Sequence, residues 1–431
     1  MSSEPSLLRV PGHSPQGQSP TSGMVCRHCQ TKLRLSFVDL GAMPPSNSYR
    51  QLEQLSEPEA KYPLRVLVCE HCWLVQTEDF ASREELFEPN YAYFSSYSTS
   101  WLAHCKNYVA QVVERFGLGS TSFVVELASN DGYLLQFVKE IGIPCLGIEP
   151  TRAPAEVAVA KGVPVLQEFF GVELGRKLAE QGQSADLLIA NNVLAHVPDI
   201  NDFVAGIAAL LKPDGVATFE FPHLLELCKN CQFDTIYHEH FSYLSLLSVE
   251  RILAYWGLFV FDVESLATHG GSLRVFAQKA STGVQSRSKR VGQMLSLERL
   301  EGLCTAAFYR GFQARAERIR ADFRRFVFHA TESDETLGAY GAAAKGNTLL
   351  NYSGVTAEQI PFVVDLNQNK QGKCLPGSRI LIVSEQYLKD AKPHYIIILP
   401  WNLRSEIVEQ LHYVRDWGGQ FVVGIPQLEV F

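Results

Sequence analysis

The chain has 431 residues and a mass of 48.1 kDa, which at about 150 residues per domain suggests roughly three domains. Apolar residues make up 46% of it and charged residues 19%, so it can fold around a sizeable core, and its formal charge of −8 argues against a non-specific nucleic-acid binder. No apolar run reaches the ~18 residues of a membrane span. We therefore expect a cytoplasmic protein with no nucleic-acid partner and no membrane partner.

The N-terminal part of the chain combines a polar tail with a turn-rich, strand-like stretch. Ser, Pro, Gly and Gln dominate residues 1–23, a composition that predicts a disordered tail. Residues 24 to about 85 follow, with an expected turn at 40–45 and an expected strand at 65–68 that leads straight into a cysteine pair.

The chain carries two CxxC pairs separated by 39 residues: Cys26 and Cys29, then Cys69 and Cys72. In a reducing compartment such pairs are more often metal ligands than disulfides. Four thiolates at ~2.3 Å leave no open position on the ion, so the spacing predicts one structural Zn²⁺. Four ordinary buried cysteines are the less favoured alternative. Another pair, Cys228 and Cys231, has no second pair to complete a site, and two cysteines one helical turn apart are favoured there.

From about residue 98, helical and strand-like patterns alternate. The expected helices are 98–116, 134–141, 153–161 and 199–211. The expected strands are 123–127, 145–148, 163–166, 186–190 and 216–221, with a turn at 212–215. Such alternation implies a mostly parallel sheet covered on both faces. Helices over 290–330 then lead to a second alternation, with strands at 337–341, 362–365 and 395–399, which is long enough for a small second doubly wound domain.

The turn Glu126–Gly132 follows a buried strand and precedes a helix. There the backbone N–H groups can approach a polar ligand at the carboxyl edge of the sheet, although the turn lacks the GxGxxG pyrophosphate cradle. Glu149 ends the next strand, where a carboxylate can accept both ribose hydroxyls of an adenosine. The pair favours an adenosine-type cofactor over the alternative, a βαβ turn with a surface carboxylate.

Four ionisable groups are crowded into the segment Tyr237–His240. If the segment is extended, Tyr237 and Glu239 share one face and the two histidines share the other; if it is coiled, Tyr237 and His240 converge. A histidine is the natural proton acceptor near neutral pH, and a carboxylate can orient it. A metal site built on His238 and His240 lacks a clear third ligand nearby.

Further polar groups stand near the ends of expected strands: Tyr91, His196, and the His269-Gly270-Gly271 loop. Each of these alone is more often structural. They can form a functional site only if the fold brings them together in space.

Taken in chain order, these features resemble one known family, the three-domain, zinc-containing C-methyltransferases that use S-adenosylmethionine (SAM) and act on nucleotide-linked deoxysugars. The resemblance covers nearly the whole chain after residue 23. Its marks are the four cysteines, Tyr-x-Tyr-Phe-Ser-Ser at 91–96, Glu126–Gly132, Asn192-x-x-x-His196, Tyr237-x-Glu239-His240, His269–Ser272, and Gly338–Asn347. Ala128 departs from the pattern, because many methyltransferases of this class carry a glycine there.

The resemblance implies an α/β protein with a central class I methyltransferase Rossmann-like domain. A small zinc-binding module precedes that domain, and a C-terminal Rossmann-like α/β domain follows it. The boundaries we expect are 1–23 for the tail, 24–85 for the zinc module, 86–330 for the methyltransferase domain with its connecting helices, and 331–431 for the nucleotide-sugar-binding domain.

For the cofactor, the resemblance implies SAM over the carboxyl ends of the central strands, with Glu149 on its ribose. The other implied cofactor-binding residues are Glu126, Ala128, Asn130, Asp131, Gly132, Asn191 and Asn192. The substrate would be a nucleoside-diphosphate 4-keto-deoxysugar, bound by His269, Gly270, Gly271, Lys345 and Asn347. The last two would hold the nucleotide diphosphate.

The implied reaction removes a proton from the carbon next to the ketone, and the enolate then attacks the sulfonium methyl group. Carbon is a poor nucleophile until it is deprotonated, so this reaction needs a base and a group that stabilises the developing oxyanion. His240 is the implied base, with Glu239 and Tyr237 orienting it or binding the sugar. Tyr91 and His196 would donate to the ketone or position the ring. We expect a monomer or a small homo-oligomer.

Three alternatives stay open at the level of the sequence. A SAM-dependent enzyme could methylate oxygen or nitrogen of another small molecule. An NAD-dependent oxidoreductase could use the turn 338–341, but the sequence shows no acidic residue clearly placed to serve that turn. A zinc-ribbon protein that binds nucleic acid or a partner is the weakest alternative, because acidic residues balance the few basic ones around the cysteines.

Overall fold

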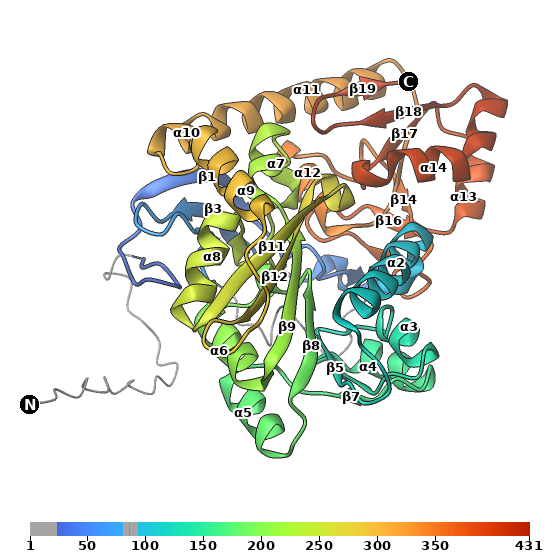
Figure 1. The fold of residues 1–431 in the computed structure, drawn as a ribbon. Helices are drawn as coiled ribbons and strands as arrows, with labels where there is room; N and C mark the ends of the chain where they lie inside the picture. Colours follow the sequence, from blue (N-terminus) through green and yellow to red (C-terminus); the bar gives the residue numbers. More distant parts are fainter. Residues whose placement is uncertain (1–23, 81–85, 87–93) are drawn as a thin grey trace, which may run out of the picture.

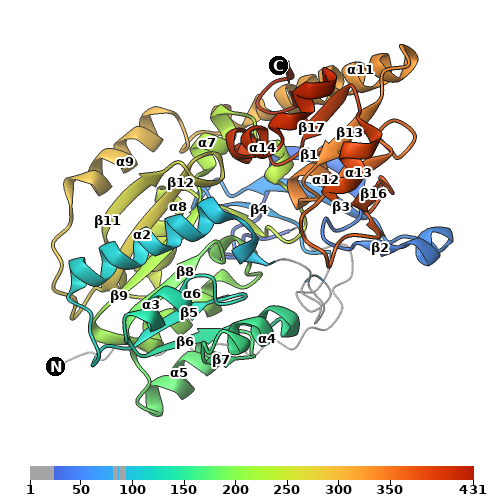
Figure 2. The same cartoon turned by 90° about the vertical axis from the view of Figure 1, so that its right-hand side faces the viewer.

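The computed structural model describes residues 24–80, 86 and 94–431, so the expected tail lies outside the described residues. Within that part of the chain, three sheets organise the molecule (Figure 1). Figure 2 separates the central sheet, coloured teal to yellow, from the C-terminal sheet, whose strands are orange to red apart from the blue β2. None of the helices in these ranges is long and apolar enough to cross a membrane.

The central sheet has seven strands in the order β11-β12-β9-β8-β5-β6-β7. The strands are β5 (Val124–Leu127), β6 (Cys145–Ile148), β7 (Val165–Leu166), β8 (Ala185–Asn191), β9 (Leu211–Pro222), β11 (Leu258–Leu266) and β12 (Ser272–Lys279). The five strands from β7 to β9 run parallel, and β12 pairs antiparallel with both of its neighbours. This confirms the mostly parallel sheet that the sequence predicts.

Helices cover both faces of this sheet. They are α2 (Thr99–Phe116), α3 (Leu135–Glu140), α4 (Arg152–Ala160), α5 (Val172–Glu180), α6 (Ile200–Leu210), α7 (Leu224–Lys229) and α8 (Leu246–Tyr255). Because strand side chains alternate between faces, Leu187 and Ile189 pack with α2, α3 and α4, while Leu188 and Ala190 pack with α5, α6 and α8. The near-continuous apolar strands of the sequence reflect this burial on both sides.

The expected strands and helices of the central domain match the observed ones to within about two residues, with one exception. The expected turn at 212–215 is wrong, because these residues lie inside β9. The register with β8 moves from Ala185 opposite Leu211 to Leu187 opposite Val216, so the extra residues form an irregularity within the strand.

The N-terminal sheet draws on two parts of the chain. It has the order β1-β3-β4-β10, with β1 (Leu35–Met43), β3 (Tyr62–Val68), β4 (Val75–Thr77) and β10 (Ser242–Tyr243). The expected turn at 40–45 is wrong in its first half, since β1 continues to Met43. Gly41 has φ 78° at a register shift of the β1–β3 pair, so a bulge stands where the sequence suggested a reversal.

The C-terminal sheet has eight strands in the order β19-β18-β17-β13-β14-β16-β15-β2. Its strands are β13 (Leu337–Tyr340), β14 (Phe362–Val364), β15 (Lys373–Cys374), β16 (Leu381–Val383), β17 (Tyr395–Ile398), β18 (Gln420–Val423), β19 (Glu429–Val430) and β2 (Arg50–Gln51). Its helices are α12 (Ala344–Ser353), α13 (Glu385–Ala391) and α14 (Arg404–Gln410). Three helices lead into this domain: α9 (Lys289–Leu300), α10 (Ala306–Arg310) and α11 (Phe312–Glu332).

Two short strands therefore cross the expected domain boundaries. β2, from the N-terminal module, completes the C-terminal sheet through β15, and β10, from the central domain, completes the N-terminal sheet through β4. The boundaries at 85 and 330 stay a prediction, but the three parts share strands as well as contacts.

Candidate active site and metal centre

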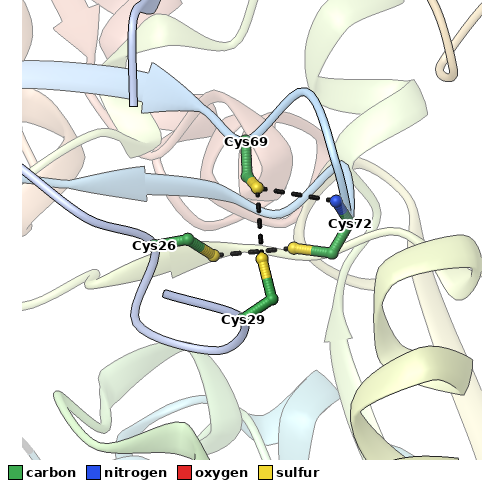
Figure 3. Close-up of side chains that lie close together, drawn as sticks. All are labelled: Cys26, Cys29, Cys69 and Cys72. Atoms are coloured by element: carbon green, nitrogen blue, oxygen red, sulfur yellow. Dashed lines mark hydrogen bonds between the residues drawn. The ribbon is translucent and has the colours of Figure 1, made fainter. Parts of the chain in front are cut away.

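The four cysteines of the two CxxC pairs converge, and Figure 3 shows their side chains pointing toward one another. The Sγ atoms of Cys26 and Cys72 are 3.5 Å apart, those of Cys29 and Cys69 are 3.4 Å apart, and all four lie within 4.8 Å of one another. Four sulfurs bound tetrahedrally at ~2.3 Å would stand about 3.8 Å apart, so the set fits one zinc ion.

Each CxxC pair sits on a tight knuckle. Gln30 N–H donates to the Cys26 carbonyl at 2.9 Å, and Trp73 N–H donates to the Cys69 carbonyl at 2.8 Å. Both donors have positive φ, 60° at Gln30 and 63° at Trp73, which turns the chain back after the second sulfur of each pair. The two knuckles thus present their sulfurs on one side, as a single metal ion requires.

The other CxxC pair has a different environment. Cys228 lies in the last turn of α7 and Cys231 follows the helix, and both are buried. Burial raises the pKa of the Cys231 thiol to about 11. Among the described residues, the only cluster of metal-ligating side chains is that of the four N-terminal cysteines, so Cys228 and Cys231 pack as core thiols.

The turn after β5 adopts the conformation of a ligand-binding loop. Ala128 and Asn130 have φ of 54° and 48°, and Gly132 has φ of 74°. Glu149, directly after β6, holds this turn, because its Oε2 accepts from Asn130 N–H at 2.9 Å and its Oε1 accepts from Thr151 N–H at 2.8 Å. Oε1 also accepts from the Thr151 hydroxyl, whereas Oε2 keeps a second lone pair for a ribose hydroxyl.

Ala128 is strained in the left-handed region, where glycine is at ease. We expect Ala128→Gly to raise the free energy of unfolding by about 1 kcal/mol, since it removes the clash between Cβ and the backbone. Thermal and urea denaturation measure the change. In a matched control, Ala208→Gly in α6 should lower stability by about 1 kcal/mol. Equal destabilisation by both variants would contradict the strain at Ala128.

Several buried polar atoms at the carboxyl edge of the central sheet have no hydrogen-bond partner among the residues that the structure describes. They are both amide atoms of Asn191, Oδ1 of Asn192 and Oδ1 of Asp131. Buried polar groups are normally satisfied, so this group fits a polar ligand lying over the ends of β5 and β8. Glu126 lies within β5, and burial, opposed by hydrogen bonding from Tyr133, raises the pKa of its carboxyl group well above its usual range.

A charged network that the sequence reasoning missed lies on β9. Glu220 is fully buried and accepts from Arg274 of β12 at 2.6 Å and from the Thr268 hydroxyl at 3.0 Å, while His104 of α2 lies 2.9 Å away. A charged residue inside the apolar run 216–221 was the available signal, because glutamate is rarely buried without partners. Nothing in the sequence around Arg274 or His104 indicates that these residues are the partners of Glu220.

The loop of His269, Gly270 and Gly271 directly follows Thr268, a member of this network. Nε2 of His269 lies 3.3 Å from Nδ2 of Asn192, and the Gly270 carbonyl accepts from Gln232 at 2.8 Å. A Cβ on Gly270 would stand 2.4 Å from the Trp401 ring, so only glycine fits there. The loop thus packs closely against Trp401 of the C-terminal domain.

The segment Tyr237–His240 is coiled, one of the two conformations the sequence left open. The Tyr237 hydroxyl lies 2.8 Å from Nε2 of His240, and His240 N–H donates to the Tyr237 carbonyl at 2.9 Å. Nδ1 of His240 lies 2.7 Å from the Thr235 carbonyl, which can only accept. The ring proton therefore sits on Nδ1, and the lone pair of Nε2 faces the Tyr237 hydroxyl.

The electrostatic surroundings keep His240 neutral. Burial lowers the pKa of its imidazole well below its usual value, and the neighbouring His196 and Lys345 lower it further. The His196 ring lies 4.5 Å from the His240 ring, and burial also lowers the pKa of His196 to about 4. A neutral imidazole with an Nε2 lone pair is the form that can accept a proton.

Glu239 and His238 point to other partners. Oε1 of Glu239 accepts from the backbone and side-chain N–H groups of Asn47, at 3.2 and 3.1 Å, and burial raises the pKa of its carboxyl group. Nε2 of His238 lies 3.2 Å from the Tyr62 carbonyl. The described residues contain no metal-ligand cluster around His238 and His240, so the HxH alternative gains no support.

Lys345 and Asn347 lie in the first turn of α12. Lys345 Nζ donates to Oδ1 of Asn402 at 2.7 Å and lies 4.9 Å from the Trp401 ring. Burial, opposed by Asp234, lowers the pKa of Lys345 to about 8. Asn347 is fully buried, and within the described part of the chain neither of its amide atoms has a hydrogen-bond partner.

A hydrogen bond joins α12 to the His240 segment. The Thr348 hydroxyl donates to the Ile236 carbonyl at 2.9 Å, directly before Tyr237. The N-terminal half of α12 therefore lies next to the His240 turn. Tyr91, expected in the same site, lies outside the described residues.

An acidic residue does stand directly after β14, which the sequence reasoning missed. The Asp365 carboxylate accepts from Ala342 N–H at 2.9 Å and from Asn367 N–H at 2.8 Å, and it lies 3.4 Å from Nζ of Lys370. In a dinucleotide site this acid would bind the ribose. Here it braces the loop before α12 and pairs with a buried lysine.

Three family models match successive parts of the chain. A "Putative zinc binding domain" matches residues 26–87, a "Methyltransferase domain" matches residues 101–262, and a "C-methyltransferase C-terminal domain" matches residues 267–426.

Among known proteins, C-methyltransferase NovU of Streptomyces niveus is 38% identical over 405 residues, which is 94% of this chain and 96% of that protein. A ubiquinone biosynthesis O-methyltransferase of Bartonella quintana is 26% identical over 94 residues, 22% of this chain and 38% of that one. Of the solved structures, the PH0226 protein of Pyrococcus horikoshii gives a TM-score of 0.37 at 15% identity and covers 46% of this chain and 99% of its own. Magnesium protoporphyrin IX methyltransferase of Synechocystis, with bound SAM, gives 0.31 at 16% identity, covering 42% and 81%.

Proposed function

Because the chain belongs to the C-methyltransferase family, we propose that its methyl acceptor is a carbon atom of a nucleoside-diphosphate 4-keto-deoxysugar. The chain is a SAM-dependent C-methyltransferase, and it carries one structural zinc ion on Cys26, Cys29, Cys69 and Cys72. A carbon next to a ketone must lose a proton before it can attack the methyl group of SAM, so the proposed acceptor requires a base.

The arrangement of His240 carries the proposal. A hydroxyl or amine acceptor has a lone pair of its own, whereas the carbon acceptor depends on a group that takes up its proton. His240 offers a neutral imidazole, with its Nδ1 proton held by the Thr235 carbonyl and its Nε2 lone pair beside the Tyr237 hydroxyl.

In the proposed reaction, the Tyr237 hydroxyl turns its proton away from Nε2 of His240. Nε2 then removes the proton from the carbon next to the ketone, and the electron pair of the broken C–H bond becomes the enolate. The resulting imidazolium donates to the Thr235 carbonyl and the Tyr237 oxygen. His196 stabilises the enolate oxygen. When bound, SAM supplies the methyl group, so the nucleophilic carbon gains a C–C bond and S-adenosylhomocysteine leaves. Tyr91 stays a proposed donor to the ketone.

The proposed cofactor site uses the carboxyl edge of the central sheet. Glu149 would bind the ribose, and the turn Glu126–Gly132 with Asn191 and Asn192 would hold the rest of the molecule. The partnerless amide of Asn191 and Oδ1 of Asp131 support this assignment, because both need a polar ligand.

The proposed substrate site uses the first turn of α12 and the loop His269–Gly271. Lys345 is a cation at a helix N-terminus, where the helix dipole also favours negative charge, so the two suit a diphosphate. The fully buried, partnerless amide of Asn347 supports a polar ligand beside it. A cytoplasmic location, where thiolates stay reduced, and a monomer or small homo-oligomer are part of the same proposal.

The experiment that tests the proposed function uses SAM with a ¹³C-labelled methyl group and a nucleoside-diphosphate 4-keto-deoxyhexose. We expect NMR spectra of the product to show the label bonded to a ring carbon next to the carbonyl. Label on oxygen, or no transfer to any 4-keto sugar nucleotide while another small molecule is methylated, would overturn the proposed acceptor.

The pKa shifts predict the pH dependence of this reaction. The base must be unprotonated, and burial lowers the pKa of His240, so activity should persist below pH 6.5 and fall only as the pH drops through the lowered pKa. Lys345 must be protonated, and its pKa is lowered to about 8, so kcat/KM should fall as the pH rises through that value. Profiles of kcat/KM against pH for the wild type and Lys345→Gln measure both limbs.

We expect Lys345→Gln to lose the alkaline limb and to keep the acid limb, because the variant lacks the titrating ammonium. An acid limb centred near the ordinary histidine pKa of about 6.5 would contradict the buried, neutral base. An unchanged alkaline limb in the variant would contradict the role of Lys345.

A further inference from the structure

The zinc module and the His240 turn share one sheet. Strand β10 begins two residues after His240, and it pairs antiparallel with β4, Ser242 opposite Gln76 and Tyr243 opposite Val75. The chain thus leaves the His240 turn directly into the sheet that carries the cysteine knuckles. Burial of these residues leaves the turn little freedom to move independently of β4.

Thr77, the last residue of β4, holds the backbone of the turn itself. Its hydroxyl donates to the His240 carbonyl at 3.2 Å, and its N–H donates to the Phe241 carbonyl at 3.1 Å. Thr77 is 2% exposed, and a β-branched side chain has few rotamers, so the hydroxyl is fixed in direction. The two hydrogen bonds hold the carbonyl groups before and after Phe241.

The preceding residue reaches the metal centre. Nε2 of Gln76 donates to Sγ of Cys26 at 3.3 Å, and Oε1 of the same amide accepts from Arg27 N–H at 2.8 Å. Gln76 is fully buried, and its amide therefore bridges the first knuckle and β4.

Arg27, inside the first knuckle, forms a second connection between the knuckle and Thr77. Its guanidinium donates to the Thr77 carbonyl at 3.0 Å and to the Pro198 carbonyl at 2.6 Å, and it stacks 5.4 Å from the Phe241 ring. Direct contacts thus join the first cysteine knuckle to β4, and β4 to the backbone of the His240 turn.

From these contacts we infer that Thr77 is a positioning residue for His240, and that the zinc knuckle sets the orientation of the imidazole through Gln76 and Thr77. The inference rests on the proposed function, since it takes His240 as the base. It assigns the metal module a part in the reaction besides stability, because small errors in the position of a base cost large factors in rate.

The test compares Thr77→Val, which keeps the shape and removes the hydroxyl, with Thr77→Ser, which restores the hydroxyl. We expect kcat to fall about ten-fold in the valine variant while KM for both substrates stays within about two-fold, and serine to recover most of kcat. Thr218→Val is the matched control: it removes another buried strand hydroxyl, bonded to Tyr108 at 2.6 Å, and should leave kcat near the wild-type value.

A spectroscopic readout separates this inference from the proposed function. In protein with ¹⁵N-labelled histidine, the Nδ1–H resonance of His240, identified by its loss in His240→Asn, should shift in Thr77→Val and stay in place in Thr218→Val. It should also shift when zinc is removed from the folded protein with a chelator, with no substrate present. An unmoved resonance in Thr77→Val, or in the metal-free protein, would overturn the inference whether or not His240 is the base.

Discussion

His240→Asn is expected to lower kcat/KM by about 10³-fold or more while SAM affinity stays within about two-fold. Asparagine can still donate an N–H toward the Thr235 carbonyl, as Nδ1 of His240 does at 2.7 Å, but it has no lone pair able to accept a proton from carbon. Steady-state kinetics and calorimetric titration with SAM measure the two quantities.

A neighbouring histidine gives the control. His238→Asn removes another buried imidazole, which contacts the Tyr62 carbonyl at 3.2 Å, and it should cost stability but retain activity to within a few-fold. Turnover by His240→Asn at a rate near that of His238→Asn would remove His240 from the role of base. A lost affinity for SAM would instead place His240 in cofactor binding.

Cys69→Ser is expected to release the zinc ion and to lower the free energy of unfolding by at least about 3 kcal/mol. Metal binding to a site of this kind is folding free energy, because the unfolded chain does not present four converging thiolates. The loss should spread beyond the N-terminal module, since β10 and β2 tie that module to the other two sheets. Elemental analysis and urea denaturation on the same sample measure both effects.

Cys304→Ser serves as the comparison, because this half-buried thiol lies outside the four-cysteine cluster. It should keep about one zinc per chain and an unfolding midpoint close to that of the wild type. If Cys69→Ser were zinc-free and yet as stable as Cys304→Ser, the metal would have no structural role.

Much of the fold was accessible from the sequence because its signals are local. Apolar runs such as 123–127 and 186–190, set between helical stretches, predict strands buried on both faces, and the structure confirms them as β5 and β8. The cysteine spacing likewise predicts the metal centre, since a CxxC knuckle needs only four residues to point two sulfurs the same way.

The shared strands could not be predicted. β2 and β10 have two residues each, so neither carries a period, and each pairs with a strand far away along the chain, such as Ser242 with Gln76. Tertiary packing alone decides such pairings. For the same reason, the sequence indicated neither the hydrogen bond between Asn47 and Glu239 nor the hydrogen bond from Thr77 to the His240 carbonyl.

For the site, the sequence supplied the chemical groups and left their geometry open. It offered two conformations for Tyr237–His240, and only the structure selects the coiled one, in which the tyrosine hydroxyl meets the imidazole. The buried Glu220 shows a signal that went unused: a carboxylate inside an apolar strand requires partners, which here are Arg274 and His104.

The measurement that tests the central claim most directly is hydrogen exchange at the substrate carbon. The enzyme is incubated in D₂O with a nucleoside-diphosphate 4-keto-deoxyhexose and S-adenosylhomocysteine, so that no methyl group can be transferred, and deuterium incorporation next to the carbonyl is followed by NMR. If His240 is the base, the wild type incorporates deuterium rapidly and His240→Asn incorporates none above background. Incorporation by the variant at the wild-type rate would contradict that role.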